Sequence, residues 1–191
     1  MGVIVGFCCA PGAARAQLVE VTTVRFSNVR APTGATGNWF EATLALVAKP
    51  APGSQMVPRV RVSFLVAFEL PAPAGGERRL EYYRAEAECV ALEPGRADVR
   101  FYLPPEIVKR DQLHGEPKYW SVDMAVEGKP VAVGRAAYAS SLAGAEQRKN
   151  FQKRVGVAAV VNDGLLIPQY LSPFLNEYPR ATPSFVRKDG R

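Results

Sequence analysis

The amino-acid sequence predicts an all-β fold in which about seven antiparallel strands form two packed sheets. Hydrophobic residues recur at every second position over most of the chain, which is the period of a strand with one buried face. The 16 Gly and 16 Pro residues provide more turn signals than a helical bundle would contain. A chain of 191 residues, of which 48% are hydrophobic and 22% charged, is long enough for one hydrophobic core.

The clearest strand is predicted at residues 59–70. Its even-numbered positions from Val60 to Leu70 are all apolar, whereas Arg59, Arg61 and Ser63 lie on the other side. On a helix the same apolar residues would be scattered around every face, so the alternation favours a strand. Similar alternation predicts further strands at 18–29, 38–49, 80–92, 97–103, 119–126 and 131–138.

Two tight turns are predicted to join neighbouring strands as hairpins. Pro94 and Gly95 lie where a turn needs a fixed φ followed by a positive one, between strands 80–92 and 97–103. Gly128 has the same role between strands 119–126 and 131–138. Seven short strands of this kind indicate an immunoglobulin-like β-sandwich, with a small barrel as the alternative.

Two helices and an extended segment interrupt or follow the strands. Residues 104–111 begin with two prolines and an acid and end in basic residues, which predicts one short helix. Residues 145–161 carry Phe151, Val155, Ala158 and Ala159 at helical spacing, which predicts a C-terminal helix. The four prolines of residues 165–191 favour an extended strap, packed on its own domain rather than on a partner. The apolar residues that require this packing are Leu166, Ile167, Tyr170, Leu171, Phe174 and Leu175.

The N-terminal residues predict export to the periplasm or cell surface. An apolar run at 3–10 precedes Ala14-Arg15-Ala16, a small-x-small cleavage pattern, so residues 1–16 are predicted to be a signal peptide. No basic residue precedes the run, which leaves open a start codon further upstream. Lipid attachment at Cys8 or Cys9 is disfavoured because the preceding residue is not small, and the run is too short to span a bilayer. The sandwich domain is then 17–142, and the helix with its strap is 143–191.

No catalytic, cofactor or metal site is predicted. The single histidine, His114, falls in a predicted loop, and Cys89 falls in an apolar strand, where cysteine is usually a buried small side chain. One histidine and one cysteine in the mature chain exclude the common zinc sites. Glu86 and Glu88 have a spacing that some glycosidases use, but an ordinary sheet surface with Arg84 as counter-charge is favoured. We therefore expect a protein that is not an enzyme and has no cofactor.

A candidate interaction surface is defined by exposed aromatic and basic residues. The net charge of +6 is spread along the chain, which does not indicate nucleic-acid binding. Tyrosines on the outward side of strands are favoured at protein interfaces, although packing within one sheet is the favoured interpretation. The basic residues near 148–154 are interpreted first as a solvated helix face. The candidate residues are Tyr82, Tyr102, Tyr119, Tyr170, Phe174, Arg148 and Lys149.

Two stretches of the sequence are distinctive, namely residues 99–111, which contain Pro104-Pro105, and residues 162–174, which begin with Asn162-Asp163-Gly164. Both resemble a small exported family of Verrucomicrobia and relatives, encoded in type IV pilus-like loci. The resemblance implies an immunoglobulin-like fold and a role in or near a pilus-like surface apparatus. It supplies no catalytic residues. We therefore expect a non-catalytic interaction module with other envelope or pilus-like proteins as partners. The alternative is a periplasmic carrier for a small apolar or anionic ligand, which would need a cavity with convergent polar groups.

Overall fold

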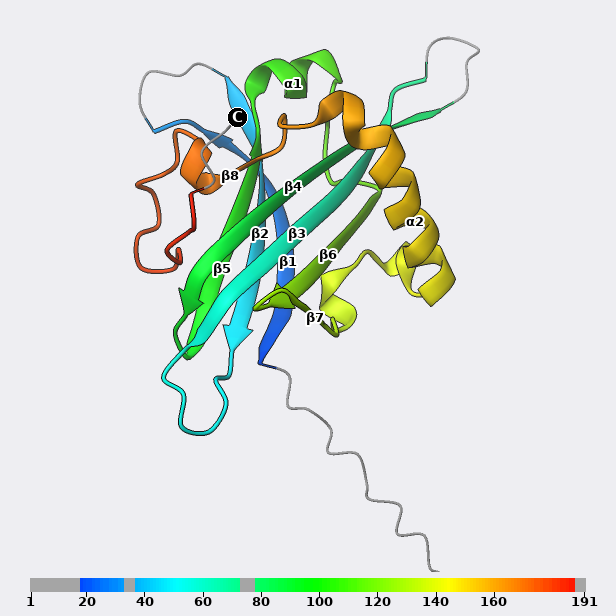
Figure 1. Cartoon of the computed structure of the whole chain (residues 1–191). Coiled ribbons are helices and arrows are strands. Elements are labelled where there is room, and N and C mark those ends of the chain that lie inside the picture. The colour runs from blue at the N-terminus through cyan, green and yellow to red at the C-terminus, as the bar shows by residue number, and fades with distance from the viewer. Residues whose placement is uncertain (1–17, 33–36, 73–77, 188–191) are drawn as a thin grey trace, which may run out of the picture.

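The computed structural model describes residues 18–32, 37–72 and 78–187, which form two antiparallel sheets packed face to face (Figure 1). The predicted all-β sandwich is confirmed. The predicted signal peptide at 1–16 lies outside the described residues. Sheet A contains, in spatial order, β1 (Val19–Arg30), β2 (Asn38–Ala48), β5 (Gly95–Leu103) and β8 (Ile167–Pro168). Sheet B contains β4 (Arg79–Leu92), β3 (Val57–Leu70), β6 (Tyr119–Val126) and β7 (Lys129–Val131).

The core lies between the sheets and is built from alternate residues of each strand. In β3, Val60, Val62 and Phe64 have 0% exposure, as the alternation predicts. The ring of Phe64 stacks on that of Phe101 from β5, with 5.6 Å between centroids. Contacts of this kind join the two sheets into one hydrophobic core.

The predicted hairpin between residues 80–92 and 97–103 is wrong. The chain does turn at 93–96, with Gly95 at a φ of +105°, but β4 belongs to sheet B and β5 to sheet A. The turn therefore carries the chain from one sheet to the other. Pro94 and Gly95 indicate that the chain reverses direction. Which sheet each strand joins is determined by its hydrogen bonds, because β4 pairs with β3 and β5 pairs with β2.

The second predicted hairpin forms, but its second strand is shorter than predicted. β6 pairs with β7 through a turn in which Gly128 has a φ of +77°. β7 ends at Val131, and residues Arg135–Ala137 form the 3₁₀-helix η1 instead of strand. Pro130 has no N–H to donate and Gly134 follows closely, so this segment is poorly suited to a longer ladder.

Both predicted helices are present. The short helix α1 (Pro105–Arg110) follows β5 at one end of the sandwich. The longer helix α2 (Ala145–Ala158) lies on the outer face of sheet B and continues into the 3₁₀-helix η3 (Ala159–Asn162). Two further 3₁₀-helices are η2 (Ser140–Leu142) and η4 (Gln169–Leu171). Among the described residues, no helix combines the length and apolar character needed to cross a membrane.

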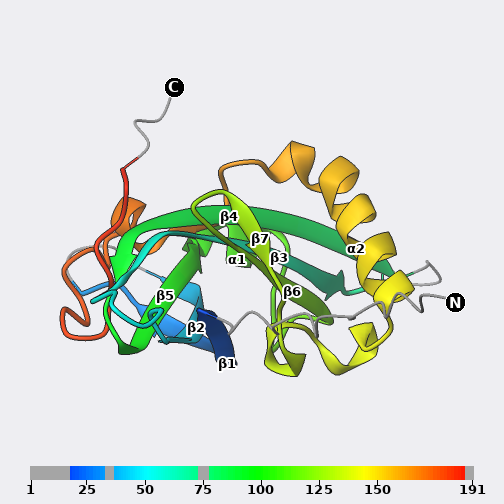
Figure 2. The ribbon, with the colours of Figure 1, turned by 60° about the horizontal axis from the view of Figure 1, so that its bottom comes forward.

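The described part of the strap, residues 165–187, packs on the opposite side of the sandwich from α2 (Figures 1 and 2). Its strand β8 pairs with the edge of β5. Further on, the Val90 N–H donates to the Ser184 carbonyl at 2.8 Å, and the Val186 N–H donates to the Glu88 carbonyl at 2.7 Å. The strap therefore pairs with part of the edge of β5 in sheet A and with residues 88–90 at the edge of β4 in sheet B.

Candidate functional site

Helix α2 is attached to sheet B by an apolar inner side. Phe151, Val155 and Ala159 are buried against Ala67 of β3. Half-buried tyrosines from the neighbouring strands surround this contact, and the ring of Tyr119 lies 6.1 Å from that of Phe151. These contacts determine which side of the helix faces the solvent.

Polar contacts fix the position of the helix further. The Gln152 amide donates to both carboxylate oxygens of Asp123, at 3.0 and 2.9 Å. Burial raises the pKa of the Asp123 carboxyl, and the hydrogen bond from Gln152 opposes this rise. Beyond the helix, Arg84 donates two hydrogen bonds to Asp163, at 3.0 and 3.2 Å. The helix is thus held at its middle and just after its end.

The opposite side of α2 and η3 exposes three valines. The exposed fractions are 75% for Val157, 57% for Val160 and 82% for Val161. Single exposed apolar residues are normal, but three within five positions form a small patch. Water is removed from such a patch when a partner covers it, which contributes about 25 cal/mol per Å² of apolar surface.

Unpaired cations lie beside these valines. Lys149, Lys153 and Arg154 are exposed, and none of them takes part in an ion pair among the described residues. A groove of about 590 Å³ runs along this side. Its lining residues are Tyr82, Asn150, Lys153, Arg154, Val157 and Ala158. We call the outward side of Lys149, Lys153, Arg154, Val157, Val160 and Val161 the α2 face.

Four of the predicted interaction residues lie on or below α2. Tyr82 lines the groove, Tyr119 is half-buried under the helix, and Lys149 is exposed on the α2 face. Arg148 has a structural role instead. Its guanidinium donates to the carbonyls of Leu142 and Ala143, at 3.1 and 2.7 Å, and lies 4.4 Å from the centre of the Tyr138 ring.

The predicted exposure of Tyr102 is wrong. Tyr102 has 0% exposure and stacks on Phe174, which has 2%, with 4.4 Å between the rings. Its hydroxyl donates to Glu41 at 2.8 Å, and burial raises its pKa. The side chain points away from the core, as the alternation indicates, but the strap covers that outer face. Tyr102 and Phe174 are therefore packing residues and do not contribute to a free surface.

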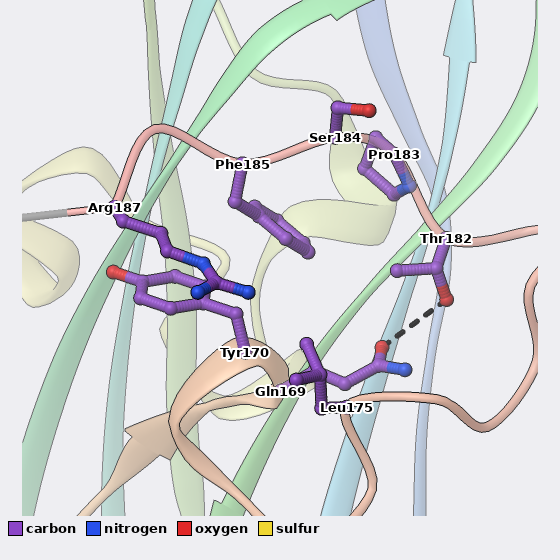
Figure 3. Close-up of a pocket in the computed structure, with 8 residues that line it drawn as sticks. All are labelled: Gln169, Tyr170, Leu175, Thr182, Pro183, Ser184, Phe185 and Arg187. Carbon is purple, nitrogen blue, oxygen red and sulfur yellow. Dashed lines mark hydrogen bonds between the residues drawn. The ribbon is translucent and has the colours of Figure 1, made fainter.

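Tyr170 lines a pocket of about 280 Å³ formed by the strap (Figure 3). Its ring lies 5.3 Å from that of Phe185. The buried Gln169 amide donates to the carbonyls of Phe174 and Glu177, and its oxygen accepts a hydrogen bond from Thr182. These polar groups bind the strap to itself. The full lining is Gln169, Tyr170, Leu175, Thr182, Pro183, Ser184, Phe185 and Arg187.

The residues considered for catalysis lie apart. His114 is exposed in a loop, and Cys89 is buried, where desolvation raises the pKa of its thiol to about 12. Glu86 lies near Arg61, Glu88 lies near Arg59, and Arg84 forms an ion pair with Asp163. Within residues 18–32, 37–72 and 78–187, no group of three His, Cys, Asp or Glu residues could hold a metal ion.

The three valines of the α2 face were not predicted as site residues. The helical spacing contains a signal for them, because at 100° per residue Val157, Val160 and Val161 lie on the side opposite Phe151, Val155 and Ala159. A helix with apolar residues on both sides, and with cations beside the outer apolar residues, indicates a second contact. The prediction of a solvated basic face considered the cations alone and did not include these valines.

No family model and no curated protein matches the chain. A crystal structure of a protein from Akkermansia muciniphila, a member of the Verrucomicrobia, is similar to it with a TM-score of 0.70 and 19% sequence identity. The similarity covers 90% of this chain and 93% of that one. At this identity the likeness shows a shared fold alone, a two-sheet sandwich with a C-terminal helix. The immunoglobulin-like assignment stays a prediction.

Proposed function

We propose that this protein is an exported, non-catalytic interaction module whose α2 face binds another envelope protein. The observation that carries the proposal is the exposure of Val157, Val160 and Val161 beside three unpaired cations. An apolar patch with a charged rim is the usual composition of a protein-binding surface. The cations select partners with carboxylates near their own apolar residues and increase the rate of encounter.

We further propose that the partner belongs to a pilus-like cell-surface apparatus, in which this chain is an accessory or structural component. The resemblance of residues 99–111 and 162–174 to a family from type IV pilus-like loci supports this assignment. The helix also suits such a role mechanically. The helix is held on the sheet by its inner side, by the contact of Gln152 with Asp123 and by the contact of Arg84 with Asp163, so a partner meets a preformed surface.

The proposal is tested by changing the α2 face and measuring partner capture from native cells. The variant Val157→Ser/Val161→Ser removes apolar surface without adding charge, and the lost surface should reduce the captured partner about tenfold, equivalent to ~1.4 kcal/mol. Val90→Ser is the matched control, because Val90 is 49% exposed on β4, away from the helix. Both variants should retain the melting temperature of the unmodified protein.

Chemical cross-linking in cells, followed by mass spectrometry of the linked proteins, identifies what is captured. Lys153→Glu/Arg154→Glu should also weaken capture, and this weakening should be larger at low salt because the contact is electrostatic. Equal capture by the unmodified protein and by both α2 variants would reject the α2 face as the binding surface. Captured proteins unrelated to a surface apparatus would reject the pilus-like assignment.

A further inference from the structure

The edge of β1 differs from the other sheet edges among the described residues. The strap pairs with β5 at Phe101 and Tyr102 and with β4 at residues 88–90, and β7 with the bridge between Ser121 and Tyr138 pairs with β6. No described strand pairs with the outer edge of β1. β1 has 12 residues and pairs on one side only, with β2. A strand edge of this length presents alternating N–H and C=O groups that another strand can use.

Among the described residues, the neighbour beside the edge of β1 lies at the start of the strand. The 3₁₀-helix η1 packs near the start of the strand, and the preceding Gly134 lies beside Glu20. A bulge at Thr22 then interrupts the pairing with β2. Residues 23–30 follow this bulge and form the outer strand of their sheet (Figure 2). We call residues 23–30 the open edge.

The side chains below the open edge are apolar and incompletely covered. Val24 and Phe26 point toward the core but are only half-buried, and so is Trp120 on β6. The Phe26 ring lies 5.7 Å from that of Phe40 and 5.8 Å from that of Trp120. An added strand would place its own inward side chains over this group and remove it from water.

The charge of the open edge is positive. Arg25 and Arg30 are exposed and take part in no ion pair among the described residues. The acid of β1, Glu20, lies before the bulge and 4.0 Å from Lys49. Arg25 lies on the outward side of β1, whereas Arg30, at the end of the strand, lies on the same side as Val24 and Phe26. A strand with an acidic residue on its outward side beside Arg25, and another at its end beside Arg30, would therefore be complementary to this edge.

We infer that the open edge of β1 binds an extended acidic segment of another polypeptide, which adds to sheet A as a strand. Its backbone bonds to residues 23–30, its apolar side chains cover Val24 and Phe26, and its carboxylates lie beside Arg25 and Arg30. A second copy of this chain fits less well. Antiparallel pairing of two β1 strands about Phe26 places both Arg25 side chains diagonally on one face, in a protein of net charge +6.

The test uses a synthetic seven-residue peptide of alternating Val and Glu with blocked ends, and a second peptide with Lys in place of Glu. The protein carries Trp39→Phe, which leaves Trp120 as its single tryptophan because the sequence has two. The Val/Glu peptide should shift Trp120 emission to shorter wavelength and slow hydrogen exchange within residues 23–30. The Val/Lys peptide should bind about tenfold more weakly.

Charge reversal provides the matched comparison. Arg25→Glu should reverse the preference between the two peptides, whereas Lys129→Glu on β7 should leave it unchanged. The inference is wrong if the Val/Glu peptide leaves exchange at 23–30 unchanged, or protects the α2 face instead. It is also wrong if the protein alone dimerises through this edge, which a disulfide between two Ser27→Cys chains would reveal. None of these outcomes decides whether the α2 face binds an envelope protein, so the proposed function is tested separately by its own variants.

Discussion

Buried polar side chains in this protein gather where a later segment of the chain packs on the sandwich. Between sheet A and the strap, Arg100 pairs with Asp98 at 2.9 Å and lies 4.2 Å from the centre of the Tyr178 ring. Between α1 and η3, Arg110 donates two hydrogen bonds to Asp111 and one to Asn162. The buried Asp98, Arg100 and Asp111 are therefore each paired with an opposite charge, which avoids the cost of an uncompensated one.

A core substitution tests the inward direction of β3. Phe64→Ala should lower the free energy of unfolding by ~3 to 5 kcal/mol, because it leaves a cavity between the sheets. Arg61→Ala should cost less than ~0.5 kcal/mol, since its contact with Glu86 is long, 3.9 Å, and exposed. Urea titration of both variants gives the two values. A larger effect at Arg61 would mean that the strand faces the other way.

Asp111 should make the protein sensitive to acid. Burial alone would raise the pKa of its carboxyl, but hydrogen bonds from Arg110 and Tyr83 outweigh burial and lower the pKa. A lowered pKa in the folded state adds stability above the unfolded pKa, and this stability is lost as the pH falls through the folded value. Asp111→Asn should therefore flatten the loss of stability below about pH 4, measured by urea titration at each pH.

Asp123 provides the opposite case for the same measurement. Its pKa is raised, so its contribution is present at low pH and is lost as the pH rises through the folded value. Asp123→Asn removes this contribution, so the free energy of unfolding should fall more steeply as the pH is lowered. Parallel pH profiles for the two variants would contradict both assignments.

At the scale of elements, the strap completes the sandwich, and a truncation measures its contribution. Ending the chain after Asp163 removes the buried side chains of Leu166 and Phe174 and uncovers Tyr102. We expect a loss of several kcal/mol, of the order of ~5, or aggregation through the uncovered strand edges. Ending the chain after Arg187 is the control and should leave the melting temperature unchanged. A truncated protein as stable as the control would show that the strap is not part of the folded unit.

Sequence patterns predicted the strands and helices themselves better than they predicted which elements pack against one another. The alternation in β3 and the stripe of Phe151 and Val155 identified the strand and helix correctly, because each depends on residues close in sequence. The exposure of Tyr102 could not be predicted in this way. Its position on the outer face follows from local alternation, whereas its burial depends on a segment about 70 residues later. For the same reason the turn at 93–96 was found but not the change of sheet.

At the scale of the whole molecule, the two proposed binding surfaces belong to different sheets. Helix α2 covers part of sheet B and carries the α2 face on its outward side, whereas the open edge is the outer edge of sheet A. One chain could therefore contact two partners at once, which suits a connecting component of an assembly. When both partners belong to one assembly, binding at one surface raises the effective concentration of the other partner. The overall affinity then exceeds the affinity of either contact alone.

Export predicts where the mature chain begins. Ala14 and Ala16 provide the small side chains that a signal peptidase accepts, so the mature protein should start at Gln17. N-terminal sequencing of protein purified from native cells is the measurement. Intact Met1 on protein recovered from the cytoplasm would contradict export.

The position of the strap in the chain sets the order in which the fold can be completed. Ribosomes deliver the chain from its N-terminus at roughly 5 to 20 residues per second, so β4 and β5 emerge several seconds before the segments that cover their edges. During this interval both sheets have exposed edges and an incomplete outer layer. Folding can therefore finish only once residues 165–187 have emerged, and until then the chain has more exposed strand edge than a sandwich sealed by its first strands would have.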